Sequence, residues 1–419
     1  MTLPPRIPEL TAAAIFVVLF ATGGRAQTDL RDKITLMNGK EVRGRVLSPF
    51  GPERILLVQG GKRKRYPHVL VRNVHTVNDD LRTFFEYRKT IGKNAKRAWF
   101  LVEWAASKKL AGMARLQALS IVLADPKHDK AHEFLGHKLR KAEWLWPVDK
   151  RHGSLAKFEK YHAKFSKAFE MTGEHFRVKT NAGVGRAVEM LFDLEKLYLF
   201  WMDTFGEPLH MREAIEPIDV HVWSSQFKFP KISAVQLPYY EIKNEYAATF
   251  FKPDAKRPEQ LFVVATQALI YATLVESGAA PDRAHLCAWA EVGLGLWVES
   301  AFDGKPGRAT PLKKARLDPL IASTVFRSRP RLNRVIHLHY ALFYEMSRMT
   351  TIRWAATEGL VHYLMSEKPD PKMRGRFMKY LERVFRKGLG DSSTAFDKAM
   401  GKVETLQPKF MRWLQVRQN

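Results

Sequence analysis

Two pairs of histidines are the residues whose type and spacing could form a metal site. His132 and His137, in the run AHEFLGH, are five residues apart, and His337 and His339, in VIHLHYALFYE, are two apart. On a continuous helix the first spacing leaves the side chains about 140° apart and the second about 200° apart. Neither pair could then share one ion. We expect the first pair to serve helix packing, and the second to divide into one buried and one exposed ring.

Other chemical motifs are absent from the sequence. It contains no GxSxG, no GxxxxGK[ST] and no GxGxxG after a strand, which would provide a nucleophilic serine, a phosphate cradle or a dinucleotide site. A dispersed Ser, His and Asp arrangement stays open, because the chain has many of each. Cys287 is the single cysteine, so no intramolecular disulfide is expected. The GLG at Gly293 to Gly295 is internal to a helical run and predicts close helix packing.

The second half of the chain has an order of segments that is typical of a known superfamily. A strand, a long helix and another strand precede an edge hairpin with PYYEIKNEYAATFF, followed by three runs: PEQLFVVATQALIYATL, CAWAEVGLGLWVES and TIRWAATEGLVHYLMSE. This order resembles the peptidase-MA-like (gluzincin) proteins. It is most similar to a group of exported bacterial proteins of uncharacterised function that carry a small barrel and a short helical repeat in front.

The resemblance implies where a zinc site would lie. Active members carry HExxH on the first run, because histidines four apart share a helix face and the intervening Glu activates a zinc-bound water. A third ligand, also Glu, comes from a WxxEGxA phrase on the next run. In this sequence the two histidine positions are Thr266 and Ile270, the catalytic Glu position is Gln267, and the third-ligand position is Val292.

These replacements predict that the chain holds no metal and no cofactor. Ile270 and Val292 have no donor atom, and the amide of Gln267 cannot act as a base near neutrality. Glu291 lies one residue before the third-ligand position, which is about 100° around a helix. Apolar replacements indicate that the former cleft floor is packed core. The alternative that this run belongs to an unrelated α-helical protein stays open.

Periodicity predicts an α+β, mostly helical protein of three parts. Residues 32–77 alternate apolar and polar side chains between turn signals, and they resemble an SH3-like or Sm-like barrel. Residues 79–146 have helical spacing and resemble a tetratricopeptide-like helical hairpin. A basic stretch over 147–167 is the expected boundary before a degenerate peptidase-MA-like domain at 168–419.

Elements of that last domain follow from the same patterns. We expect strands at 175–179 and 218–223, a long helix at 183–205 and a hairpin within 233–251. The expected later helices are 257–277, 282–300, 317–326, 334–348, 351–366, 372–387 and 392–401.

The N-terminus predicts export. Residues 1–26 combine Arg6, an apolar run from Leu10 to Phe20 and the small residues Gly23, Gly24 and Ala26. This run is too short to span a membrane and is typical of a cleaved signal peptide. No later segment predicts a second span. We therefore expect an exported protein, periplasmic or secreted, that begins near Gln27.

The formal net charge of +26 would attract a polyanion such as nucleic acid, acidic polysaccharide or an anionic surface. No nucleic-acid-reading motif accompanies the basic clusters, so we interpret most of this charge as a solvated surface.

The favoured interpretation is a non-catalytic binding protein of the cell envelope. Its partner would be a protein or polypeptide, held beside the edge strand in a cleft near Tyr239, Tyr240 and Trp289. One alternative is a zinc peptidase with an unorthodox site that uses Glu291, His285 or His339. Another is a basic polyanion-binding protein.

Overall fold

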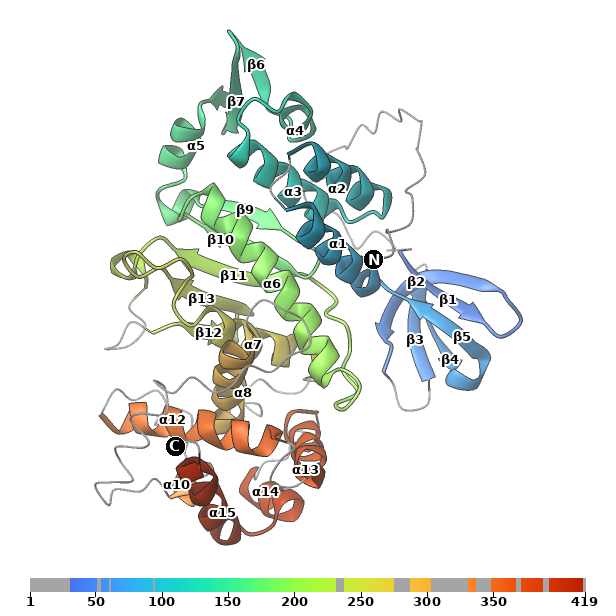
Figure 1. The fold of residues 1–419 in the computed structure, drawn as a ribbon, viewed down its shortest axis with the longest axis vertical. Coiled ribbons are helices and arrows are strands. Elements are labelled where there is room, and N and C mark those ends of the chain that lie inside the picture. Colours follow the sequence, from blue (N-terminus) through green and yellow to red (C-terminus); the bar gives the residue numbers. More distant parts are fainter. Residues whose placement is uncertain are drawn as a thin grey trace, which may run out of the picture.

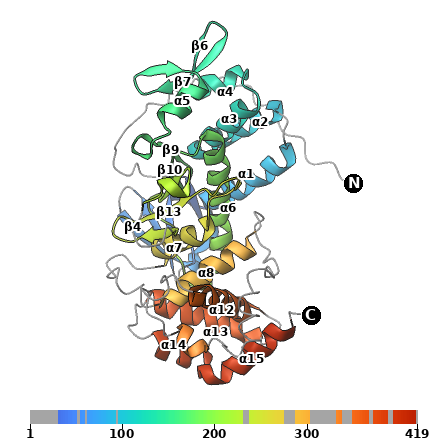
Figure 2. The same ribbon diagram turned by 90° about the vertical axis from the view of Figure 1, so that its left-hand side faces the viewer.

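The computed structural model describes most of the chain after its first thirty residues. The described ranges are 31–50, 54–59, 62–92, 95–230, 237–274, 287–302, 331–336, 348–366, 371–386 and 392–416. The fold mixes α and β structure and is mostly helical. In two views the N-terminal helices lie at one end, a sheet lies in the middle and the C-terminal helices lie at the other end (Figures 1 and 2). The expected signal peptide lies outside the described residues.

The N-terminal part is an open antiparallel sheet of five strands. They are β1 (Asp32–Leu36), β2 (Glu41–Ser48), β3 (Arg54–Gln59), β4 (Lys62–Pro67) and β5 (Val71–His75). The order is β4-β3-β2-β1-β5, around a small core that includes Ile34, Val46 and Leu57. The strands were predicted, but the closed barrel was not found: no described pairing joins the edge strands β4 and β5. The register of β2 on β3 shifts between Val46 and Ser48.

Four helices follow the sheet. They are α1 (Val77–Ile91), α2 (Ala95–Ser107), α3 (Ala111–Ala124) and α4 (Asp129–Phe134). A capping box starts α1, where the Thr76 N–H donates to the Asp79 carboxylate at 2.8 Å. The helix α3 packs against α2, α4 and the later helix α6. The tetratricopeptide-like interpretation of these helices stays a prediction.

The prediction of helices over residues 79–146 was wrong for its last part, from residue 138 to residue 146. Gly136 has a φ of +74° just after α4, and a meander follows: β6 (Lys138–Arg140), β7 (Glu143–Val148) and β8 (Arg151–Gly153). The run EWLWPV alternates in exposure and carries Pro147, and both properties favour a short strand over a helix. The helix α5 (Leu155–Tyr161) closes this region by packing on β7.

A mixed five-stranded sheet forms the middle of the molecule. Its strands are β9 (Phe169–Thr172), β10 (Phe176–Thr180), β11 (Ile218–Trp223), β12 (Tyr239–Glu241) and β13 (Tyr246–Phe250), in the order β12-β13-β11-β10-β9. The pairs β10–β11 and β11–β13 are parallel, and the outer strands β9 and β12 are antiparallel to their neighbours. The two predicted strands and the hairpin are confirmed.

Helices pack against this sheet and continue beyond it. The helix α6 (Val184–Phe205) contacts β9 and β10, whereas α7 (Leu261–Thr273) contacts β11, β12 and β13, and the two helices touch each other. The remaining elements are α8 (Ala288–Ala301), α10 (Leu332–Ile336), α12 (Arg348–Met365), α13 (Pro371–Leu381), a π-helical turn (Glu382–Arg386), α14 (Ser392–Met400) and α15 (Val403–Val416).

Most of the predicted C-terminal helices have a counterpart among these elements. The helix α15 was not predicted, and the helix expected at 317–326 lies outside the described residues, as does most of the one expected at 334–348. In the described part, no helix has both the length and the apolarity to cross a membrane.

Candidate functional site

The four positions at which the resemblance would place zinc ligands and the catalytic Glu lie in the packed interior. Thr266, Gln267 and Ile270 are on α7, and Val292 is on α8; each of these four side chains is at most 2% exposed. The helix α7 is covered by the sheet and by α6, and α8 packs against α7 and α12. The described ranges contain no group of three or more His, Cys, Asp or Glu residues placed to hold a metal ion.

Two glycines let α8 approach its neighbours closely. A Cβ on Gly293 would lie 2.7 Å from the side-chain methyl carbons of Thr357 and Val361 on α12. A Cβ on Gly295 would lie 3.0 Å from the backbone oxygen of Val263 on α7. The expectation of close helix packing at this GLG is confirmed.

Glu291 is a buried carboxyl at the junction of three elements. It is 1% exposed, and burial raises its pKa to about 8, while the Tyr271 hydroxyl of α7 acts in the opposite direction. Its charge in turn raises the pKa of Tyr240 on β12 and that of the Cys287 thiol, although burial is the main cause for both. Glu291 is therefore largely protonated at neutral pH.

Tyr271 and Glu291 each lie one residue away from a ligand position of the resemblance. Tyr271 follows Ile270 on α7, and Glu291 precedes Val292 on α8. One residue corresponds to about 100° around a helix, so this polar pair lies beside the expected metal position on each helix.

The three residues of the expected cleft point into different surroundings. Tyr240 packs toward α7, where its ring centroid lies 4.9 Å from that of Tyr271. Tyr239, the preceding residue of the strand, lies on the opposite face of the sheet and packs on Phe229. Trp289 packs on Tyr380 of α13, with ring centroids 5.8 Å apart. The structure does not bring the three side chains together.

The pair His132 and His137 differs from the expectation drawn on a continuous helix. The helix α4 ends at Phe134, and the backbone N–H of His137 donates to the His132 carbonyl at 3.0 Å. The two rings therefore meet, with Nδ1 atoms 2.7 Å apart, instead of pointing about 140° from each other. Trp144 stacks on His132, and Trp146 lies against His137.

Packing remains the role that the geometry of this pair supports. Burial is the largest cause that lowers the pKa of His137, to about 3, so this ring is neutral at pH 7. A separation of 2.7 Å is a hydrogen-bond distance. His285, His337 and His339 lie outside the described residues.

A second cluster of polar residues, which the sequence did not indicate, joins the N-terminal sheet to the middle of the molecule. It begins at Glu195 of α6, which is fully buried. One carboxylate oxygen accepts from the backbone N–H groups of Glu174 and His175, both at 2.8 Å, and of Phe176 at 3.1 Å. The other accepts from His175 Nδ1 at 2.9 Å. A Cβ on Gly173 would lie 2.2 Å from Glu195 Oε1, so this turn requires glycine.

The cluster continues through Tyr198 to the segment before β11. The Tyr198 ring stacks on His175 with centroids 3.6 Å apart, and its hydroxyl donates to Glu213 at 2.5 Å. Asn78, at the start of α1, donates to the other oxygen of Glu213 at 2.8 Å. Burial raises the pKa of both Tyr198 and Glu213.

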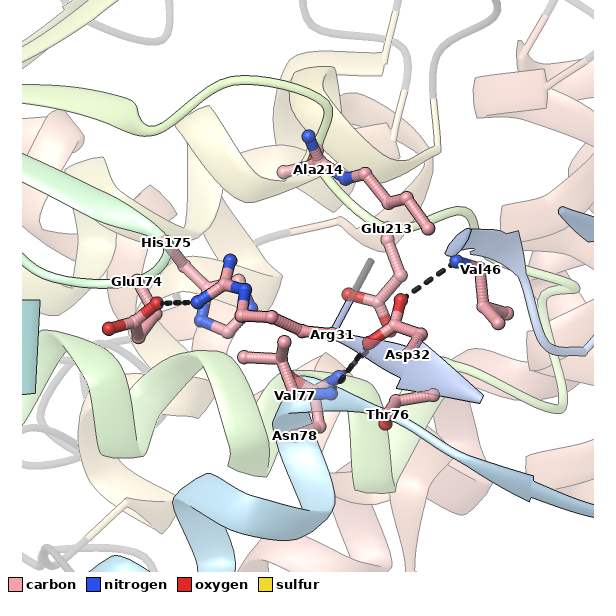
Figure 3. A pocket seen from close by; sticks show the side chains of 11 residues that line it. Arg31, Asp32, Val46, Thr76, Val77, Asn78, Glu174, His175, Glu213 and Ala214 are labelled. Atoms are coloured by element: carbon pink, nitrogen blue, oxygen red, sulfur yellow. Dashed lines mark hydrogen bonds and ion pairs between the residues drawn. The ribbon is translucent and has the colours of Figure 1, made fainter. Parts of the chain in front are cut away.

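Arg31 and Asp32 complete the cluster from the N-terminal side (Figure 3). The Arg31 guanidinium is paired with Glu174, whose pKa is nevertheless raised by burial. The Asp32 carboxylate accepts from the N–H groups of Val46 at 2.7 Å and Val77 at 2.8 Å. These side chains line a cavity of about 30 Å³.

This second cluster holds segments together. Its four carboxylates accept hydrogen bonds from the chain's own donors, and these donors come from the N-terminal sheet, α1, α3 and the turn before β10. Such an arrangement fixes the position of the sheet and is not suited to activating a substrate. In the sequence Glu195 is one of several charged residues of this helix, with Asp193 and Lys196 close beside it, so no local signal marks it as buried.

No protein-family model matches the chain, and no curated protein matches it either.

Proposed function

We propose that the chain is a non-catalytic binding protein of the cell envelope, with a peptidase-MA-like body that lacks zinc ligands. The observation that carries this proposal is the burial of Thr266, Gln267, Ile270 and Val292 in the contacts of α7 and α8. Two of these side chains have no donor atom, and none is a carboxylate, an imidazole or a thiolate.

The order and contacts of the elements support the gluzincin-like interpretation. Strand β10, helix α6, strand β11, the hairpin β12–β13 and helices α7 and α8 follow one another as the resemblance requires. The helix that would carry HExxH packs beneath the antiparallel edge strand, and the helix of the third ligand packs on it.

A polypeptide is the partner that this edge fits best. The strand β12 is the outer strand of the sheet, so one side of its backbone is not paired within the described residues. Ring contacts hold this strand on both faces of the sheet. Tyr240 packs on Tyr271, and Tyr239 packs on Phe229. Because the side chains toward α7 are buried, a partner would add to the edge of the sheet and would not enter a cleft.

Binding of short extended peptides tests the proposal. Peptides selected from a displayed library are compared with the same sequences N-methylated at alternate residues, which removes backbone donors and leaves side chains unchanged. We expect a peptide to lose most of its affinity when the methylated residues are those whose N–H groups face β12. Methylation of the alternate residues, whose N–H groups point away from β12, should have little effect. Equal affinity of both registers would contradict strand addition.

A zinc peptidase with an unorthodox site is the second candidate. The observation in its favour is the buried Glu291 carboxyl beside the Tyr271 hydroxyl, adjacent to the expected metal position. This candidate predicts stoichiometric zinc and proteolysis that a chelator abolishes.

A further inference from the structure

The N-terminal sheet concentrates positive charge. Residues 31–76 contain eleven Lys and Arg but three Asp and Glu. Figure 1 shows this sheet extending sideways from the body, beside α1. Its edge strand β4 exposes Lys62, Arg63, Lys64 and Arg65 to solvent.

Most of these cations are exposed. Within the described residues, no carboxylate lies within ion-pair distance of the exposed side chains of Lys40, Lys62, Arg63, Lys64, Arg65 and Arg72. Four of them follow one another along the edge strand β4. Charges on an edge strand also prevent aggregation, so the cations alone do not identify a partner.

Three large apolar side chains protrude from the same sheet. Met37 in the β1–β2 turn is 63% exposed, and Val69 and Leu70, between β4 and β5, are 82% and 53% exposed. They form one group, because the Met37 N–H donates to the Leu70 carbonyl at 2.9 Å. Lys40 lies in the same turn as Met37, and Arg72 follows Leu70 closely, so cations border the apolar group.

We propose that this end of the N-terminal sheet docks on an anionic lipid surface. Cations attract the headgroups, and the three apolar side chains enter the boundary between headgroups and acyl chains. A soluble polyanion would use the cations and leave the apolar group in water. Single-stranded nucleic acid is disfavoured because the aromatic residues of this region, Phe50 and Tyr66, are part-buried and offer no stacking platform.

Vesicle co-sedimentation tests this proposal. The chain starting at Gln27 lacks the apolar run from Leu10 to Phe20 and keeps every described residue. It is mixed with vesicles of phosphatidylcholine, with or without phosphatidylglycerol. We expect binding to the anionic vesicles alone, and weakening of that binding as salt is raised.

Two double variants separate the charge from the apolar group. Lys40→Thr with Arg72→Thr, which removes the two cations that border the apolar group, should weaken binding about 25-fold, at about fivefold for each cation. Val69→Ser with Leu70→Ser should weaken it by roughly tenfold or more, although the charge is unchanged. The matched control is Lys138→Thr with Arg140→Thr, which removes two exposed cations from β6 and should leave binding unchanged.

Three results would overturn the proposal. They are equal binding to both kinds of vesicle, no binding to either, and full binding by the Val69 and Leu70 variant. The last result combined with a loss in the Lys40 and Arg72 variant would assign the surface to a soluble polyanion. Unfolding curves of each variant establish that it is folded, and the salt dependence of the unmodified chain tests the charge without any substitution.

Discussion

Replacing Glu291 with glutamine tests whether this carboxyl is buried and unligated. Burial raises its pKa from an ordinary 4.5 to about 8, so the folded state resists ionisation that the unfolded state undergoes freely. A raised pKa in the folded state stabilises the fold fully below pH 4.5, and that stabilisation is lost as the pH rises through 8. Since one pKa unit corresponds to about 1.4 kcal/mol, the loss between pH 5 and pH 9 is about 4 kcal/mol.

The assay is urea unfolding of both proteins between pH 5 and pH 9, followed by tryptophan fluorescence. Glutamine cannot ionise, so the variant does not lose this stability as the pH rises. Between pH 5 and pH 9 the unfolding free energy of Glu291→Gln should therefore rise by about 4 kcal/mol relative to that of the unmodified chain. Other titrating groups cancel in this difference. Glu133→Gln, at an exposed position on α4, is the matched control and should show no such shift.

A pH-independent difference would refute the argument from burial. A difference of opposite sign would mean that the carboxylate form is stabilised, as a bound cation would do, and would favour the unorthodox peptidase.

Three further predictions concern packing and the buried polar groups. Gly293→Ala should destabilise the protein by about 1–3 kcal/mol because its Cβ meets α12, whereas Gly375→Ala, with nothing within 4 Å, should be neutral or slightly stabilising; equal effects would contradict the close packing. Tyr198→Phe should cost about 1–3 kcal/mol in urea unfolding, since Glu213 loses a buried donor, and a neutral result would mean that the cluster does not hold the sheet. His137→Gln should reduce the loss of stability that acid causes below pH 6.5. The folded state lowers the pKa of His137 to about 3, so the stability that this neutral ring contributes is complete above pH 6.5 and is lost as the pH falls. Unchanged acid unfolding would contradict burial of this ring.

Local sequence patterns predicted those helices and strands in which buried residues recur at a regular spacing. The apolar run of α7 and the glycines of α8 were recognisable because burial on all sides leaves few polar residues in a helix. The alternation in β10 and β11 was equally clear. Each of these features depends on neighbours a few residues away along the chain.

Features that depend on chain direction or on distant residues were missed. Gly136 ends α4 and turns His137 back toward His132, which a helical angle cannot anticipate. The cluster around Glu195 joins residues from seven separate segments, and no spacing links them. The open N-terminal sheet follows from pairing between strands, and alternation alone does not specify whether a sheet closes.

Metal content shows whether the chain holds a catalytic zinc ion. The chain is equilibrated with zinc, passed through gel filtration and submitted to elemental analysis. We expect substoichiometric zinc, because Thr266, Gln267, Ile270 and Val292 supply no ligand set. A zinc ion held tightly at one per chain would contradict this expectation and favour a metallopeptidase.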